Sequence, residues 1–150
     1  MDRIDMNLFT IGFTGKSAEK FFILLESSKA SNLIDIRINR TSQLAGFAKE
    51  QDLKFFLPKL AGMQYSVRED LAPTKELLTS YRDKEISWAE FSQKYQELVQ
   101  DRGVLETFLP ADFDNSVLLC SESEPEKCHR TLLADLIIKK FPNFGVTNLI

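Results

Sequence analysis

Short apolar runs recur along the chain, and polar or turn-forming residues bound each of them. Runs of this length that are rich in β-branched residues are typical of buried strands. The run from Leu33 to Ile38 is apolar on both of its faces, which suits the interior of a parallel sheet. The predicted strands are Leu8–Ile11, Leu33–Ile38, Met63–Val67, Ser116–Cys120 and Val146–Ile150.

Between these runs, apolar residues recur at the three- and four-residue spacing of amphipathic helices. The clearest helix begins after Ser87, because Ser87 and Glu90 form a capping box and Gly103 ends the pattern. Its apolar stripe is predicted to be core and consists of Trp88, Phe91, Tyr95, Leu98 and Val99. Three further helices are predicted after Ser17, from Lys49 to Leu60 with Pro58 near the end, and from Thr74 to Arg82, where Thr74 is the expected cap. A last helix is predicted after Cys120. Its start is either a capping box of Ser123 and Glu126, or Glu124 as the cap with Pro125 in the first helical position.

Strands that alternate with helices predict an α/β fold. We expect residues 1–150 to form a single compact three-layer domain with a mainly parallel sheet. Ligands bind beyond the carboxyl ends of the strands in such sheets. Gly12, Asp35 and Cys120 stand at or near the ends of three predicted strands, so they are expected to meet at one edge.

Composition narrows the class of protein. The net charge of −3 provides no overall basic field for nucleic acid, although a local basic patch is compatible with it. No apolar run approaches the roughly 18 residues of a membrane span, and no apolar stretch of a signal peptide follows Met1–Asp5. A cytoplasmic location without membrane contact is therefore expected, and the two cysteines are expected to be thiols.

The segment from Gly12 to Ser17 ends in Gly-Lys-Ser after a strand, as a phosphate-binding P-loop does. A P-loop places a glycine where this chain has Thr10, so the turn is too short to wrap a triphosphate. A turn of this kind could still hold one anion at a helix start, or it could simply connect a strand to a helix that Ser17 caps.

Asp35 and Arg37 are two residues apart on a predicted strand, so their side chains point to the same side. They could form a salt bridge, or Arg37 could direct its planar fork of donors at an anionic ligand. The polar loop from Asn39 to Phe47 could recognise a ligand, or it could be a solvated connection.

The segment from Cys120 to Arg130 holds both cysteines and the only histidine. A thiol near a helix N-terminus and near cations forms a thiolate readily, and Cys120 with His129 is the more plausible nucleophile–base pair. The Cys-to-Arg spacing is too long for a phosphatase loop. The spacing to Cys128 is unusual for zinc, so no residue is assigned to a metal. Burial of both cysteines and of His129 as packing residues is the alternative.

Several motifs together carry a family resemblance. They are Thr10-Ile11-Gly12, Gly15-Lys16-Ser17, Asp35-Ile36-Arg37, Leu44-Ala45-Gly46-Phe47, Leu71-Ala72-Pro73-Thr74-Lys75, and Cys120-Ser121-Glu122 followed by Pro125 and Cys128-His129-Arg130. With these motifs the chain resembles, from about Leu8 to Leu149, the bacterial and archaeal family called domain of unknown function 488. The last motif is the most specific. The resemblance implies a compact α/β domain and no settled activity.

The sequence therefore favours a small enzyme that acts on an anionic or nucleotide-like substrate at the strand carboxyl ends. The predicted catalytic residues are Cys120, His129 and Glu122, and the predicted substrate-binding residues are Gly12, Asp35, Arg37 and Arg130. The alternative is a binding module for a nucleotide or nucleic acid without chemistry, and a metalloprotein using Cys120, Cys128 and His129 is a third hypothesis. The reaction and any cofactor are unknown at this stage.

Overall fold

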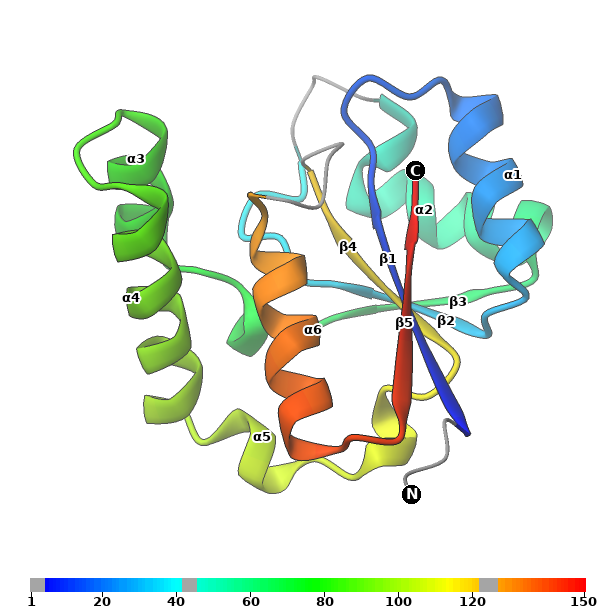
Figure 1. Ribbon diagram of the computed structural model, residues 1–150. Coiled ribbons are helices and arrows are strands. Elements are labelled where there is room, and N and C mark those ends of the chain that lie inside the picture. The colour runs from blue at the N-terminus through cyan, green and yellow to red at the C-terminus, as the bar shows by residue number, and fades with distance from the viewer. Residues whose placement is uncertain (1–4, 42–45, 122–126) are drawn as a thin grey trace.

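The computed structural model describes residues 5–41, 46–121 and 127–150, and its centre is a parallel β-sheet (Figure 1). The strands are β1 (Met6–Gly12), β2 (Asn32–Asp35), β3 (Gln64–Val67), β4 (Ser116–Cys120) and β5 (Phe144–Leu149). They lie in the order β3-β2-β4-β1-β5, and every pair is parallel. The predicted α/β domain with a parallel sheet is confirmed.

The order of the strands creates a topological switch point between β2 and β4. The chain leaves the carboxyl end of β2 toward β3, at one edge of the sheet, and leaves the carboxyl end of β4 toward β5, at the other edge. Connections that diverge from two neighbouring strands open a crevice at their carboxyl ends, where parallel sheets bind ligands. Asp35 pairs with Leu119 in this register, one residue before Cys120.

Helices cover both faces of the sheet and complete the three predicted layers (Figure 1). Helices α1 and α2 lie on one face, and α6 lies on the other with α4 and α3 beyond it. The helices are α1 (Ala18–Ser28), α2 (Glu50–Phe56), α3 (Lys75–Arg82), α4 (Trp88–Asp101), α5 (Val104–Thr107) and α6 (His129–Lys140). Ser17, Thr74 and Ser87 cap α1, α3 and α4 as predicted, and Ser87 and Glu90 form the predicted capping box.

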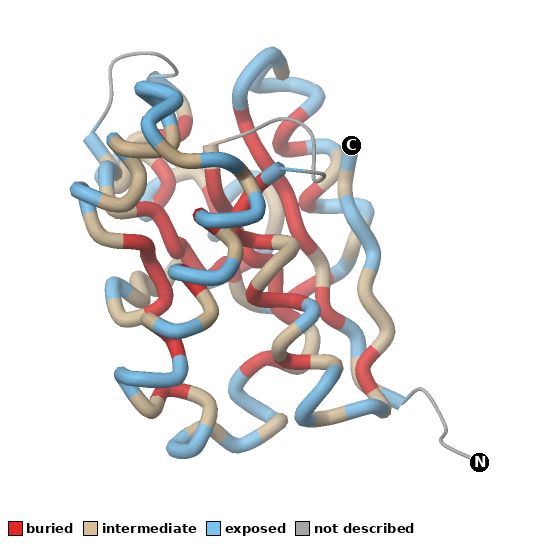
Figure 2. Tube along the Cα trace, turned by 60° about the vertical axis from the view of Figure 1, so that its left-hand side comes forward, coloured by how far each residue is buried: buried red, intermediate tan, exposed pale blue. Residues whose placement is uncertain are grey.

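The core consists of two apolar clusters separated by the sheet, and the buried segments run through the middle of the molecule (Figure 2). Phe91, Tyr95 and Val99 of α4 are buried in the cluster that contains α6, which confirms the centre of the predicted stripe. Trp88 and Leu98, at its margins, are only half-buried. The other cluster includes Phe21, Phe22 and Leu25 of α1.

Several element boundaries differ from the predictions. Strand β2 ends at Asp35, because the Asp35 carboxylate accepts the backbone N–H of Arg37 and turns the chain out of the strand. The helix after Lys49 passes at Leu57 into a π-helical turn that contains Pro58 and ends at Gly62. Helix α5 was not predicted, and β5 starts two residues before Val146.

Helix α6 begins at His129, with Cys128 as its N-cap residue in extended conformation. The predicted starts at Ser123 or Glu124 lie outside the described residues. None of the helices in the described part of the chain is long and apolar enough to span a bilayer.

Candidate functional site

A pocket open to solvent lies at the carboxyl ends of β2 and β4. The segment after β2, the end of β4 and the start of α6 form one part of its wall, and residues of α3 and α4 form the other. Its described lining residues are Arg37, Ile38, Asn39, Pro73, Leu78, Tyr81, Arg82, Trp88, Phe91, Cys120, Ser121, Lys127, Cys128 and His129. The pocket occupies the switch point, as the rule for parallel sheets predicts.

Arg37 is held in the pocket wall by a buried carboxylate. Its Nε and Nη2 atoms donate to Oδ1 and Oδ2 of Asp35 over 2.9 and 2.7 Å, and its backbone N–H donates to Oδ1 over 3.1 Å. The Tyr65 hydroxyl donates to Oδ2 over 2.5 Å. Burial, together with this hydrogen bond, raises the pKa of Tyr65, so the phenol stays a donor. The predicted salt bridge between Asp35 and Arg37 is confirmed, and contact of Arg37 with an anionic ligand stays a prediction.

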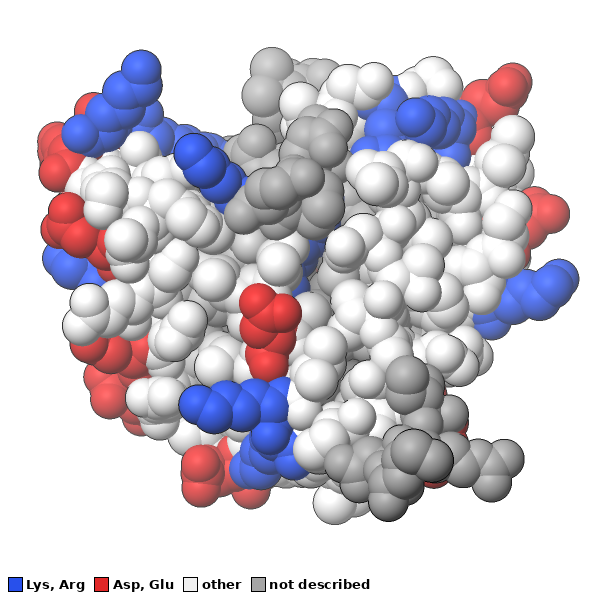
Figure 3. Space-filling view, viewed as in Figure 1, with Lys and Arg blue, Asp and Glu red and all other residues white. Residues whose placement is uncertain are grey.

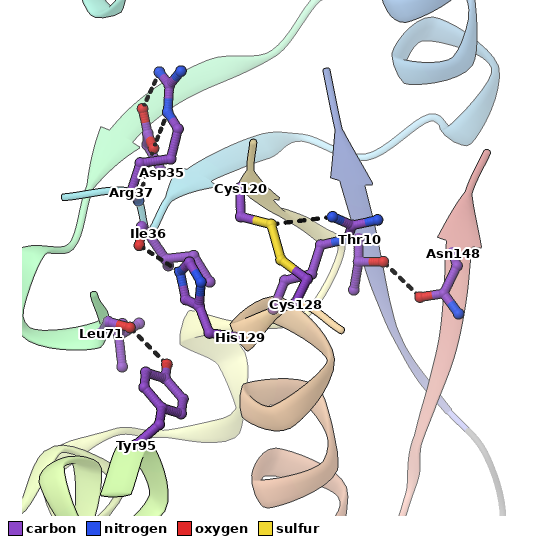
Figure 4. The surroundings of a disulfide bond; sticks show 11 residues. Thr10, Asp35, Ile36, Arg37, Leu71, Tyr95, Cys120, Cys128, His129 and Asn148 are labelled. Atoms are coloured by element: carbon purple, nitrogen blue, oxygen red, sulfur yellow. Dashed lines mark hydrogen bonds and ion pairs between the residues drawn. A yellow bond between two sulfur atoms is a disulfide. The ribbon is translucent and has the colours of Figure 1, made fainter. Parts of the chain in front are cut away.

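The two cysteines are joined by a disulfide bond between the end of β4 and the start of α6 (Figure 4). The prediction of two thiols is therefore wrong for this structure. The reason is local: the extended backbone at Cys128 brings its sulfur back to Cys120, whereas a position inside the helix was expected. The Nη1 atom of Arg130 donates to Sγ of Cys120 over 3.0 Å, and both residues are buried.

His129 lies beside the disulfide but uses one ring nitrogen elsewhere. Its Nε2 atom is 2.8 Å from the carbonyl oxygen of Ile36, and since a carbonyl only accepts, Nε2 carries the proton. Burial lowers the pKa of His129 to about 4, and the charge of Arg130 acts in the same direction. The imidazole is therefore neutral near pH 7. Its ring also makes an edge-on contact with the ring of Tyr95.

Charge in the described lining is of one sign. Arg37, Arg82 and Lys127 line the pocket, and no aspartate or glutamate stands among the described lining residues. Elsewhere the charges are mixed: Figure 3 shows basic and acidic side chains interspersed around the rim of the face seen in Figure 1. The positive character is thus local, in agreement with a net charge of −3.

An aromatic wall faces these cations. Tyr81, Trp88 and Phe91 line the pocket, and their rings contact one another with centroids 5.1 to 5.4 Å apart. The apolar stripe of α4 was predicted to be core only. In the first turn of α4, Trp88 and Phe91 pack against the core and also line the pocket. Sequence reasoning also missed Tyr65, Arg82 and Lys127. No periodicity distinguishes these residues, and only the fold brings them to the site.

The predicted site residues fall into three groups. Arg37, Cys120 and His129 line the pocket, whereas Gly12, Asp35 and Arg130 are not among its lining residues. Asp35 and Arg130 contact lining residues from behind, and Gly12 pairs with Cys120 in the sheet. Glu122 lies outside the described residues. The catalytic and binding roles of these residues stay predictions.

Cys120, Cys128 and His129 are also a set of metal-ligating residue types. One ligand atom of each lies within 4.8 Å of the others. Both sulfurs belong to the disulfide in this structure, so they could bind a metal only after reduction.

The Gly-Lys-Ser turn lies outside the lining of this pocket. Ser17 caps α1 by accepting from the backbone N–H of Lys20, and Gly15 has the left-handed φ of 79° that the turn requires. The backbone N–H of Thr14 donates to the carbonyl oxygen of Ser121, which joins this turn to the end of β4. These contacts support the prediction that the segment from Gly12 to Ser17 connects a strand to a capped helix.

Comparison with known proteins gives one match. A family model described as "Domain of unknown function DUF488" matches residues 17–137. Searches of curated proteins and of solved structures give no match to the chain.

Proposed function

Because the chain belongs to the DUF488 family, whose description names no activity, we propose a function from the pocket itself. The pocket between β2 and β4 binds a small anionic molecule that has an aromatic part, and a nucleotide is the best-fitting class. Arg37 donates to the anion, and Asp35 and Tyr65 hold Arg37 in place.

The observation that carries this proposal is the unbalanced charge of the pocket wall. Asp35 neutralises Arg37, but Arg82 and Lys127 line the pocket without a carboxylate among the described lining residues. Arg37 presents a guanidinium whose position is fixed before a ligand arrives. A preorganised guanidinium loses little freedom on binding and matches the geometry of a phosphate group.

The aromatic wall argues for a ligand with a flat ring. Base–aromatic stacking contributes about 1–3 kcal/mol per base, and the half-buried rings of Trp88 and Tyr81 stand in the lining with Arg82. A nucleoside phosphate combines the two features that the wall offers. Inorganic phosphate would use only the cations, and a nucleoside would use only the rings.

Chemistry on the bound molecule requires the reduced protein. In that form Cys120 is the proposed nucleophile, with its thiolate stabilised by Arg130. His129 is the proposed acid–base group, and it would act through Nδ1, since Nε2 is committed to Ile36. The commitment of both groups in this structure favours the second candidate function, a nucleotide-binding module without chemistry. A turnover assay on reduced and oxidised protein discriminates the two.

Thermal unfolding in the presence of ligands tests the proposal. Nucleoside monophosphates at about one hundred times their Kd should stabilise the parent by about 2.7 kcal/mol, which raises the Tm by about 5–10 °C. Arg37→Lys should reduce this shift, because lysine lacks the fork that contacts carboxylate and phosphate together. Each shift is measured against the same variant without ligand.

Arg68→Lys is the matched control, because Arg68 pairs with Asp70 on the surface and does not line the pocket. It should respond to ligand as the parent does. The proposal fails if no anion shifts the Tm of the parent, or if Arg37→Lys and Arg68→Lys respond alike.

A further inference from the structure

The disulfide in the pocket wall has a different environment at each sulfur. Both Cys120 and Cys128 line the pocket, so the bond lies in the pocket wall, where the two residues are 1% and 3% exposed. The buried guanidinium of Arg130 donates to the sulfur of Cys120, whereas Cys128 is the N-cap residue of α6. Figure 4 shows the bond between the end of β4 and the start of α6.

This asymmetry determines how the bond can break. A thiolate is the leaving group in thiol–disulfide exchange, and the better-stabilised thiolate leaves faster. The N-terminus of α6 stabilises a thiolate on Cys128 as well. A direct hydrogen bond from a guanidinium is the stronger of the two effects, so Cys120 is the better leaving group and attack on Cys128 is the favoured direction. The lining cations attract an anionic reagent to the same place, and the absence of carboxylates among the described lining residues removes a source of repulsion.

We propose that Cys120 and Cys128 form a reversible redox pair that exchanges with small thiols bearing a carboxylate or another anionic group. The thiolate of the small molecule attacks Sγ of Cys128 and forms a mixed disulfide, and the electron pair of the broken bond goes to Sγ of Cys120. A second thiolate attacks the sulfur of the bound small molecule and releases Cys128. In total, two small thiols are oxidised to one small disulfide, and the protein disulfide is reduced to two thiols. The two protons that the small thiols lose are taken up by the thiolates of Cys120 and Cys128.

This inference rests on the cation-lined pocket of the proposed function. It assigns to that pocket an activity that the binding of a nucleotide does not require. It also gives the disulfide a role as a reactive group instead of a covalent cross-link between β4 and α6.

The rate of reduction by thiols of different charge tests the exchange. Protein purified without reductant is treated with 3-mercaptopropionate, 2-mercaptoethanol or cysteamine, which are anionic, neutral and cationic. Samples are quenched with maleimide and weighed by mass spectrometry, and since the chain has only two cysteines, each mass is unambiguous. Each rate is divided by the rate of the same thiol with an uncharged linear disulfide, which removes the intrinsic reactivity of the thiol.

The anionic thiol should have the highest normalised rate and the cationic thiol the lowest, with a difference of about tenfold that shrinks as salt rises. Arg82→Gln, which removes an exposed lining cation, should narrow the difference. Peptide mapping at short times should find the mixed disulfide on Cys128. Equal normalised rates, or a mixed disulfide mainly on Cys120, would overturn the proposal.

The state of the purified protein provides a further decisive outcome. If both cysteines react with maleimide before any thiol is added, and elemental analysis finds one metal per chain, the pair is a metal site with His129 and the exchange is wrong. Failure of the exchange is distinguishable from failure of the proposed function. If nucleotides raise the Tm but the three thiols react at equal normalised rates, only the exchange is wrong. If the anionic thiol reacts fastest but no nucleotide raises the Tm, only nucleotide binding is wrong.

Discussion

The guanidinium of Arg130 donates from Nη1 to the sulfur of Cys120 over 3.0 Å in the fully buried centre of the molecule. The hydrogen bond links the first turn of α6 to the end of β4, directly behind the pocket. It places a positive charge in direct contact with Sγ of Cys120. Both the proposed nucleophile and the proposed redox pair depend on it.

Replacing Arg130 should slow the opening of the disulfide. A hydrogen bond to a charged group contributes about 1.5–3 kcal/mol, so Arg130→Gln should reduce the rate of reduction by about tenfold or more. Arg130→Lys keeps the charge and should be intermediate. The measurement is the maleimide-quenched rate with 3-mercaptopropionate, in variants whose circular dichroism spectra match the parent. Arg68→Gln is the control, and a rate equal to that of the parent in folded Arg130→Gln would contradict the role of Arg130.

Stability should fall in acid because of His129. Its pKa is about 4 in the folded protein, below the 6.5 that is usual for histidine, so the folded state disfavours the proton that the unfolded chain binds. The contribution of His129 to the free energy of unfolding is therefore complete above pH 6.5. It is lost as the pH falls toward 4, and the total loss is about 3 kcal/mol.

Urea unfolding of the parent and of His129→Gln across pH 4 to 7.5 measures this loss. Glutamine keeps a donor for the carbonyl of Ile36 and does not titrate, so its stability should vary less with pH. As the only histidine of the chain, His129 also gives a single set of ring proton resonances. A titration midpoint near 6.5 in the folded protein would show that the ring is not buried as described.

Removing the carboxylate of Asp35 should be costly. Asp35→Asn leaves Arg37 buried with a weakened partner, and breaking a buried ion pair costs about 3–5 kcal/mol. Tyr65→Phe removes one hydrogen bond to this carboxylate and should cost about 1.5–3 kcal/mol. Asp70→Asn, in an exposed pair with Arg68, should change the free energy of unfolding by less than about 1 kcal/mol. Equal effects of Asp35→Asn and Asp70→Asn in urea melts would rule out a special role for the Asp35–Arg37 pair.

The core role of α4 can be measured with a pair of identical substitutions. Phe91 is 1% exposed and Phe55 is 58% exposed. Phe91→Ala should lower the free energy of unfolding by about 3–5 kcal/mol, whereas Phe55→Ala should lower it by less than about 1 kcal/mol. Denaturant melts decide, and a small effect of Phe91→Ala would mean that α4 does not pack on α6 as described.

The fold was largely predictable because its signals are local. Alternating apolar runs and caps such as Ser87 identify strands and helices from neighbouring residues alone. The strand-end rule for parallel sheets then predicts that Arg37 and Cys120 lie at one edge of the sheet. The exit of the chain from β2 at Asp35 was not predictable, since it depends on a side chain accepting the N–H of Arg37.

The composition of the pocket depends on contacts between distant segments. Arg82 and Trp88 lie in elements far along the chain from β2, and nothing in their local pattern marks them as site residues. Likewise, Cys120 and Cys128 are eight positions apart in the sequence, and Cys128 was expected to lie within a helix. Their pairing follows from where α6 begins, which capping signals upstream of Cys128 did not indicate.

Trp88 can report directly on whether the pocket binds a nucleotide-like anion. Trp88 is the only tryptophan of the chain and lines the pocket, so its fluorescence is measured during titrations with a nucleoside monophosphate, the matching nucleoside and inorganic phosphate. We predict a saturable change with the monophosphate, at least about tenfold weaker binding of the other two, and a loss of affinity in Arg82→Gln and at high salt. Unchanged fluorescence up to millimolar nucleotide, or equal binding of nucleoside and monophosphate, would contradict the account.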